Sequence, residues 1–209
     1  MKKKDIIILL IALLSIGGVI LFSNLSNKKE DKTEETKPET TNLLSGKYNV
    51  EIKVKKYGTI KVELDADEAP ITVTNFINLV NEGFYDGLTF HRIIDNFMIQ
   101  GGGYKEDGSY KNADTIKGEF INNGYENNIS HKRGVISMAR ANSYDSGSSQ
   151  FFITNADSFH LDGNYAAFGY VTKGMDVVDK IAKDAKPTDK NGSIKIEERP
   201  VIEYIKVIE

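Results

Sequence analysis

The sequence contains no cysteine among its 209 residues. Disulfide bonds, thiolate metal sites, a thiol nucleophile and a cysteine-linked lipid are therefore excluded, and a chain of this length can bury a core without such cross-links. Histidine is also scarce, and the three histidines are too far apart in the sequence to form a recognisable metal-ligand pattern. We therefore expect no metal ion and no other cofactor.

Neither sign of charge is in large excess. The chain has 27 Lys and Arg against 30 Asp and Glu, whereas a general affinity for nucleic acid would require a surplus of positive charge. We expect no nucleic-acid partner. Two further signatures are missing: Gly101–Gly103 lacks the G-x-G-x-x-G pattern and is predicted to begin a flexible loop, and Ser137 lacks the G-x-S-x-G context of a serine hydrolase.

One long apolar run is present, at the N-terminus. Lys2 to Lys4 precede the uncharged residues 6–22, which span about 26 Å as a helix against about 30 Å of membrane hydrocarbon. We predict a transmembrane anchor over residues 1–26 of a single-pass cell-membrane protein. A cleaved signal sequence, which would make the protein secreted, and a buried core helix are the alternatives. The lysines favour a cytoplasmic N-terminus, so the rest of the chain is expected on the extracytoplasmic side.

Residues 27–45 are charged, rich in threonine and almost without apolar side chains. Such a segment cannot bury enough surface to offset the entropy of ordering, so it is predicted to be a disordered linker. At this length it would hold a domain about 20 to 30 Å from the anchor. Residues 46–209 contain no internal repeat and are predicted to form one globular domain, expected to be a monomer.

Within this domain, period-two alternation predicts a series of strands. Residues 48–55 and 58–65 form the first predicted hairpin, and a helix is expected from Pro70 to Gly83. A second helix includes Met175, Val178 and Ile181. The remaining predicted strands are near residues 88–94, 97–100, 134–139, 149–154, 166–171 and 200–207. About eight strands and two helices suit a mostly β fold, a closed eight-stranded antiparallel barrel capped by two helices, although periodicity alone also allows a sandwich.

Four segments share a mixture of aromatic side chains and sparse polar groups. They are FHRIIDNFMIQGG from Phe90, SMARA from Ser137, GSSQFFITNA from Gly147 and HLDGNYAAFGYV from His160. In this order and spacing they resemble a cyclophilin of the bacterial type, over about residues 46–209. The resemblance favours the barrel over the sandwich. It implies a peptidyl-prolyl cis-trans isomerase, which acts on proline-containing unfolded or flexible polypeptides.

The resemblance also implies the positions that bind and turn the proline peptide. Gln100 would hydrogen-bond the substrate carbonyl, and Gln150 would support the neighbouring strand. His160 stands where many members carry tryptophan, Tyr165 stands where many carry histidine, and the segment 141–148 is one residue longer, so binding of cyclosporin-type inhibitors is expected to be weak. The implied site residues are Arg92, His91, Phe97, Met98, Gln100, Ala139, Gln150, Phe152, His160, Leu161 and Tyr165.

Arg92 is the predicted catalytic residue. Rotation of an X-Pro bond weakens its amide resonance, so the prolyl nitrogen becomes a better hydrogen-bond acceptor in the twisted state than in the planar one. A guanidinium is always charged and offers several N–H donors, and an apolar wall would exclude water around it. An isolated arginine is more commonly a surface or ion-pair residue, so the hypothesis depends on its occurrence together with the other segments.

Two functions remain open from the sequence. The first is an isomerase that accelerates X-Pro rotation in extracytoplasmic client proteins. The second is a chaperone or assembly module that binds proline-containing segments in the same groove with little turnover.

Overall fold

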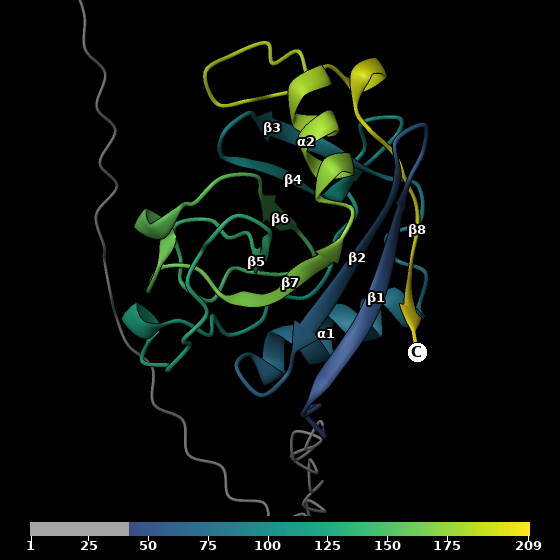
Figure 1. Ribbon diagram of the computed structural model, residues 1–209. Coiled ribbons are helices and arrows are strands. Elements are labelled where there is room, and N and C mark those ends of the chain that lie inside the picture. Colours follow the sequence, from purple (N-terminus) through teal and green to yellow (C-terminus); the bar gives the residue numbers. More distant parts are fainter. Residues whose placement is uncertain (1–41) are drawn as a thin grey trace, which may run out of the picture. The chain divides into compact units, whose positions relative to one another are not determined.

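The computed structural model describes residues 42–209 (Figure 1). The predicted anchor, residues 1–26, lies outside the described residues, as does all but the end of the predicted linker. Between residues 42 and 209, no helix combines the length and the apolar character needed to cross a membrane. The description that follows therefore concerns the predicted globular domain.

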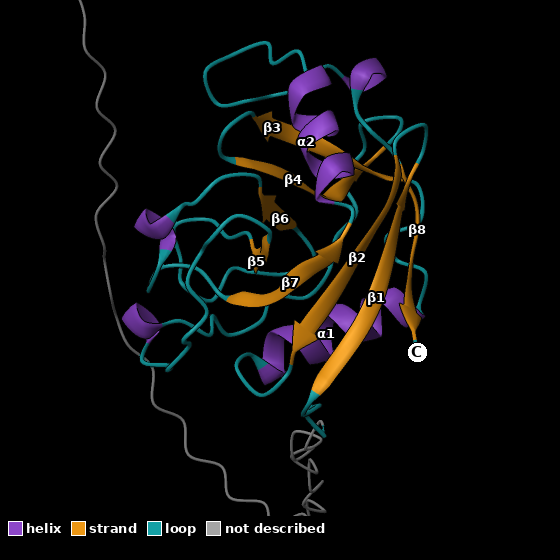
Figure 2. Cartoon of the chain, viewed as in Figure 1, coloured by secondary structure: helices purple, strands orange, loops and turns teal. Residues whose placement is uncertain are grey.

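Eight antiparallel strands form one curved sheet in the order β3-β4-β6-β5-β7-β2-β1-β8 (Figure 2). The strands are β1 (Lys47–Val54), β2 (Gly58–Asp65), β3 (Leu88–Ile94), β4 (Met98–Lys105), β5 (Val135–Met138), β6 (Phe151–Thr154), β7 (Ala167–Lys173) and β8 (Ile202–Ile208). The mostly β fold with eight antiparallel strands and two helices is thus confirmed.

The closure expected of a barrel is less complete than predicted. The sheet curves into a half-barrel, and its edge strand β3 meets the residue before the other edge strand, β8, through an isolated bridge between Thr89 and Val201. Next to it, the backbone N–H of Phe90 donates to the carbonyl oxygen of Pro200 at 2.9 Å. Pro200 has no N–H of its own to donate, so a regular ladder cannot continue through it.

The first hairpin shows why the period-two pattern predicts the sheet so well. Lys56 turns the chain with a positive φ of 67° between β1 and β2. Val50 and Ile52 of β1, like Ile60 and Val62 of β2, are fully buried, because successive side chains of a strand point to opposite faces. These side chains belong to the main hydrophobic core inside the curved sheet.

Helices α1 (Pro70–Asn81) and α2 (Met175–Asp184) lie at opposite ends of the sheet (Figure 1). The N-terminus of α1 is capped from a distant segment, because the carboxylate of Glu119 accepts the backbone N–H groups of Ile71 and Thr72 at 2.9 and 2.7 Å. Burial raises the pKa of Glu119. This contact attaches the long connection between β4 and β5 to the helix.

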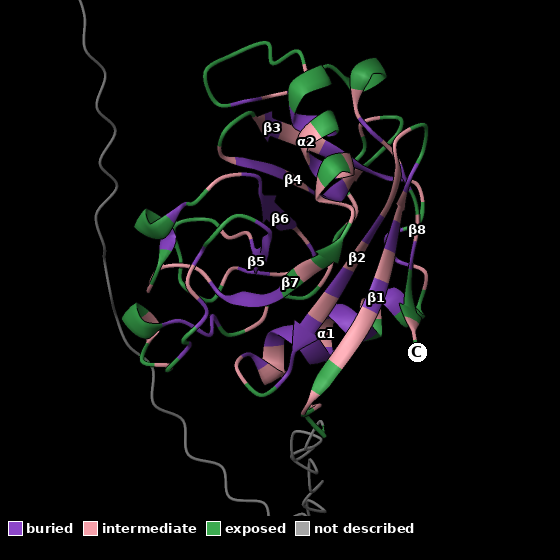
Figure 3. Ribbon diagram, viewed as in Figure 1, coloured by how far each residue is buried: buried purple, intermediate pink, exposed green. Residues whose placement is uncertain are grey.

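The predicted loop beginning at Gly101 is wrong, because β4 continues through the three glycines to Lys105. A Cβ on Gly101 would lie 2.8 Å from the carbonyl oxygen of Thr89, and one on Gly103 would lie 2.7 Å from Cγ of Gln150. The glycines therefore allow neighbouring groups to approach the strand closely, a role that side-chain periodicity does not reveal. Figure 3 shows the buried residues along the central strands and the exposed ones in the connections and on the outer side of α2.

Candidate active site

A cleft of about 140 Å³ lies on the outer face of the sheet. Strand β3 contributes an arginine, β4 and β6 contribute apolar side chains, and the segments after β5 and before β7 complete the lining. The lining residues are Arg92, Phe97, Met98, Gln100, Ala139, Arg140, Phe152, Leu161 and Tyr165. The structure thus brings together, from five segments, most of the residues that the sequence motifs pointed to.

The apolar wall of the cleft is separate from the main core. Met98, Phe152 and Leu161 are almost fully buried, but they form a small cluster of their own. Strand alternation explains the separation, since the neighbours Ile99 and Ile153 point into the main core while Met98 and Phe152 point outward. The result is a buried apolar surface that the packing of the domain itself does not require.

Arg92 is held at the edge of this wall by three contacts. Its Nε donates to the carbonyl oxygen of Asn191 at 2.7 Å, and its Nη1 donates to Oε1 of Gln100 at 3.1 Å and lies 3.7 Å from Sδ of Met98. Burial lowers the pKa of Arg92, opposed by Tyr165 and Asp189, yet a guanidinium keeps its charge at neutral pH. A fixed cation therefore borders an apolar cleft.

The side-chain amides of Gln100 and Gln150 extend the hydrogen bonding of Arg92. Because Gln100 accepts from Arg92 through its carbonyl oxygen, its amide nitrogen faces Gln150 and donates to Oε1 of that residue at 3.1 Å. Gln150 lies across Gly103, outside the apolar cleft. It lines an adjoining hollow of about 240 Å³ that shares Gln100, Ala139 and Arg140 with the cleft.

Arg140 is a lining residue that sequence reasoning missed. Its guanidinium carbon lies 4.8 Å from the ring centre of Tyr165, 5.0 Å from that of Tyr144 and 5.2 Å from that of Phe120. Its Nε also donates to the carbonyl oxygen of Asn164 at 2.9 Å. Cation–π contacts of this kind fix a side chain. The only sequence signal was its place inside SMARA, because its aromatic partners come from separate segments.

Besides Gln150, two predicted site residues lie outside the cleft lining. The ring of His160 packs against Phe97 with centres 5.4 Å apart, at the rim. His91 lies where the register of β3 against β4 shifts, between Phe90 and Arg92, and its ring lies 4.7 Å from that of Tyr104. Burial, with Arg199 nearby, lowers the pKa of His91 to about 4. The structure therefore does not bring His91 to the cleft.

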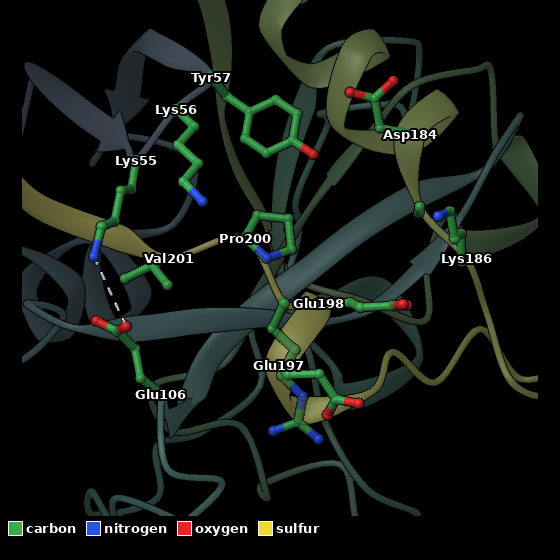
Figure 4. Close-up of a pocket in the computed structure, with 12 residues that line it drawn as sticks. Lys55, Lys56, Tyr57, Glu106, Asp184, Lys186, Glu197, Glu198, Pro200 and Val201 are labelled. Atoms are coloured by element: carbon green, nitrogen blue, oxygen red, sulfur yellow. Dashed lines mark ion pairs between the residues drawn. The ribbon is translucent and has the colours of Figure 1, made fainter.

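A larger hollow of about 380 Å³ lies between the β1–β2 turn, the end of α2 and the segment before β8 (Figure 4). It is lined by charges of both signs, among them Lys55 and Glu106, whose charged atoms are 4.0 Å apart. It contains none of the motif residues. The smaller cleft, with its apolar wall and a few convergent polar groups, has the lining typical of a ligand site. Among the residues that the structure describes, no cluster of His, Asp and Glu could hold a metal ion.

Comparison with known proteins agrees with this arrangement. A family model described as "Cyclophilin type peptidyl-prolyl cis-trans isomerase/CLD" matches residues 49–207. The chain is 45% identical over 131 residues to peptidyl-prolyl cis-trans isomerase A of Dickeya dadantii (strain 3937), covering 60% of this chain and 67% of that protein. It is 46% identical over 117 residues to peptidyl-prolyl cis-trans isomerase B of Bacillus subtilis (strain 168), covering 56% and 78%.

A solved structure shows the same architecture. It is a cyclophilin type peptidyl-prolyl cis-trans isomerase of Cryptosporidium parvum, crystallised in the presence of the dipeptide Ala-Pro. The TM-score is 0.61 at 27% sequence identity, and the match covers 77% of this chain and 99% of that one.

Proposed function

The chain belongs to the cyclophilin-type peptidyl-prolyl cis-trans isomerases, and from this premise we propose that Arg92 stabilises the twisted X-Pro bond of a substrate held in the cleft. The relatives with similar sequences are named as peptidyl-prolyl cis-trans isomerases. The activity of this family is acceleration of X-Pro rotation. The mechanism, the clients and the location of the domain are the parts we propose.

The uncatalysed barrier to peptide-bond rotation is about 18 to 20 kcal/mol, because rotation removes the amide resonance. In the twisted state the prolyl nitrogen regains a lone pair, and a donor placed beside it binds that state better than the planar one. The contacts of Nε with Asn191 and of Nη1 with Gln100 orient the guanidinium of Arg92. Its Nη2 has no protein partner among residues 42–209, so it is the group we assign to the prolyl nitrogen.

The apolar wall supplies the second part of the mechanism. Met98, Phe152 and Leu161 are buried apolar side chains, so they would surround the ring of a bound proline without holding water next to it. Exclusion of water strengthens the hydrogen bond from Arg92, because screening is weak in a dry site. Holding the ring still while the preceding carbonyl turns removes part of the entropy cost. No proton is transferred in this scheme.

The observation that carries the proposal is the position of Arg92 against the apolar wall, and the test is direct isomerisation of a short Ala-Pro peptide. We expect Arg92→Ala to lower kcat/KM by about 10- to 150-fold, the value of a charged hydrogen bond of about 1.5 to 3 kcal/mol. Arg199→Ala is the matched control, since Arg199 is also half-buried but stacks on Tyr104, outside the cleft.

The same assay separates the two functions that the sequence left open. A binding module would capture the Ala-Pro peptide without accelerating its isomerisation. Near-normal turnover in Arg92→Ala would refute the mechanism, and capture by the unmodified protein without any acceleration would refute the enzymatic function itself.

We also propose that the domain acts on extracytoplasmic clients from a membrane tether. The support is the sequence alone, namely Lys2 to Lys4, the apolar residues 6–22 and the charged linker 27–45. Isomerase activity on intact cells should then disappear after treatment with external protease. Activity that survives the protease until the cells are broken would show that the domain lies inside.

A further inference from the structure

Behind the cleft, an aspartate, a histidine and a serine form a hydrogen-bonded series. The ring of His131 is 1% exposed, its Nδ1 lies 2.8 Å from Oδ1 of Asp162, and its Nε2 lies 3.0 Å from Oγ of Ser137. Asp162 also accepts the backbone N–H of His131 at 2.7 Å and the hydroxyl of Ser130 at 2.6 Å. Both ring nitrogens of a buried histidine are therefore engaged.

The partners determine the tautomer of His131. An ionised carboxylate can only accept hydrogen bonds, so Nδ1 carries the proton that is donated to Asp162. Nε2 then has a lone pair and accepts the hydroxyl proton of Ser137. Both hydrogen bonds therefore point the same way, from the Ser137 hydroxyl to the imidazole and from the imidazole to the Asp162 carboxylate.

This geometry resembles a hydrolytic triad, but it cannot act as one. Ser137 is fully buried within β5, so no substrate carbonyl can reach its oxygen. It also lacks the sharp turn that exposes a nucleophilic serine. Any role of these three residues must therefore come from their effect on neighbouring residues.

The surroundings of these three residues are the walls of the proline cleft. Ser137 pairs directly with Phe152 in the β5–β6 ladder, and the ring of His131 lies parallel to that of Phe152, with centres 6.1 Å apart at an angle of 15°. Asp162 immediately follows the wall residue Leu161. His131 also accepts the backbone N–H of Ser158 through its carbonyl oxygen at 2.7 Å. One buried side chain thus joins the segments that carry two wall residues.

We propose that His131 is a positioning residue for prolyl isomerisation, which holds Phe152 and Leu161 in place through its bonds to Ser137 and Asp162. The inference rests on the isomerase function proposed above. It assigns to His131 no contact with the substrate. Loss of its hydrogen bonds would let the wall residues move away from a bound proline ring, so that water could reach the ring.

The positioning role has a pH dependence with a definite sign. The ionisable groups that act on His131 are Asp162 and His160, and burial lowers the pKa of His131 although Asp162 opposes the shift. Because the folded-state pKa is lowered, the stabilising contribution of the neutral ring is complete above its ordinary pKa of about 6.5 and is lost as the pH falls through the folded-state value. A protonated Nε2 becomes a donor, so the Ser137 hydroxyl would have to rotate to accept from it, and its own hydrogen would lose the acceptor that the neutral ring provides.

The first test separates positioning from stability. His131→Phe keeps an aromatic ring beside Phe152 but removes both side-chain hydrogen bonds, and we expect kcat/KM for an Ala-Pro peptide to fall about 10-fold, as for one lost buried hydrogen bond. Adding Ser137→Ala removes the hydroxyl left without a partner, so the double variant should regain thermal stability while its kcat/KM stays low. Val178→Ala in α2, remote from the cleft, is the control for loss of stability alone.

The second test is the pH profile, measured in a His160→Gln background so that the rim histidine does not contribute. We expect kcat/KM to be flat from about pH 6.5 to 9 and to fall at lower pH. The acid limb should disappear in His131→Phe. It should move to lower pH in Asp162→Asn, because the carboxylate that favours the imidazolium is gone.

The outcomes are distinguishable. If the unmodified protein does not accelerate isomerisation, the proposed function fails. If it does, and the double variant has unmodified kcat/KM or the acid limb persists without His131, the positioning role is overturned.

Discussion

The two faces of strands β4 and β6 carry similar apolar side chains in different surroundings. On the inner face, Phe151 packs against the rings of Phe76, Tyr85 and Phe90 in the main core. On the outer face, Phe152 is just as apolar and almost as buried, but it belongs to a small cluster that borders a cleft and a fixed arginine. Apolar residues on the inner face are explained by packing, whereas those on the outer face line the cleft in which we propose that the substrate binds.

The largest expected effect comes from shortening each member of this neighbouring pair. Phe151→Ala should lower the free energy of unfolding by about 3 to 5 kcal/mol, because it leaves a closed cavity in the core. Phe152→Ala should cost less stability, because the space joins a cleft that is open to water, but it should reduce kcat/KM at least as strongly as Arg92→Ala. Urea unfolding and peptide isomerisation measure the two quantities.

Two results together would contradict this difference between the faces. They are an equal loss of the free energy of unfolding in the two variants, and a kcat/KM of Phe152→Ala within a few-fold of the unmodified value.

A smaller effect is expected from the glycines of β4. A Cβ on Gly101 would meet the backbone of β3, whereas one on Gly103 would meet the side chain of Gln150. Gly101→Ala should therefore destabilise the fold by about 1 to 3 kcal/mol through overpacking. Gly103→Ala should displace Gln150 and raise KM for peptides that reach the adjoining hollow, with a smaller loss of stability.

Thermal unfolding measures the loss of stability in each variant, and steady-state kinetics measures the change in KM. The opposite pattern, with KM changed by Gly101→Ala and stability lost mainly in Gly103→Ala, would contradict this division of roles.

The smallest expected effect concerns His91, which is adjacent to Arg92 in β3 but does not line the cleft. The pKa of His91 is lowered to about 4, mainly by burial. The stabilising contribution of its neutral form is therefore complete above about pH 6.5 and is lost as the pH falls toward 4, which amounts to about 1 to 2 kcal/mol after allowance for solvent relaxation. The melting temperature should fall over this range.

His91→Phe should make that part of the acid-induced loss of stability disappear, because the variant has no imidazole to protonate. If the melting temperature of the variant depends on pH as strongly as that of the unmodified protein, other groups account for the acid sensitivity.

Much of the fold could be predicted because its signals are local. The strand Gly58–Asp65 has the predicted bounds, since period-two alternation over eight residues is a direct consequence of strand geometry. The strand Leu88–Ile94 also has the predicted bounds, although its burial does not alternate. Pro70 begins α1 as expected, because proline suits the first turn of a helix. The extension of β4 through Gly101 could not be predicted in this way, because residues without side chains carry no periodic signal.

In the candidate site, too, local motifs could be predicted from the sequence and side-chain placement could not. The motifs around Arg92 and Phe152 could be found in the sequence because each is a short local pattern. The placement of His91 could not, since resemblance to a family does not say to which face of a strand a side chain points. Strand alternation does not give the answer either, because the register of β3 against β4 shifts between Phe90 and Arg92, on either side of His91.

The sequence by itself determined the strand pattern, the family and the apolar residues that build the cleft, because backbone geometry and short motifs act over a few neighbouring residues. Only the tertiary structure decided which distant groups meet. His131 reaches Asp162 across 31 positions of the chain, and Arg140 is enclosed by rings from three segments. Such contacts depend on how the sheet curves and how its connections return over it, and no local period in the sequence encodes that path.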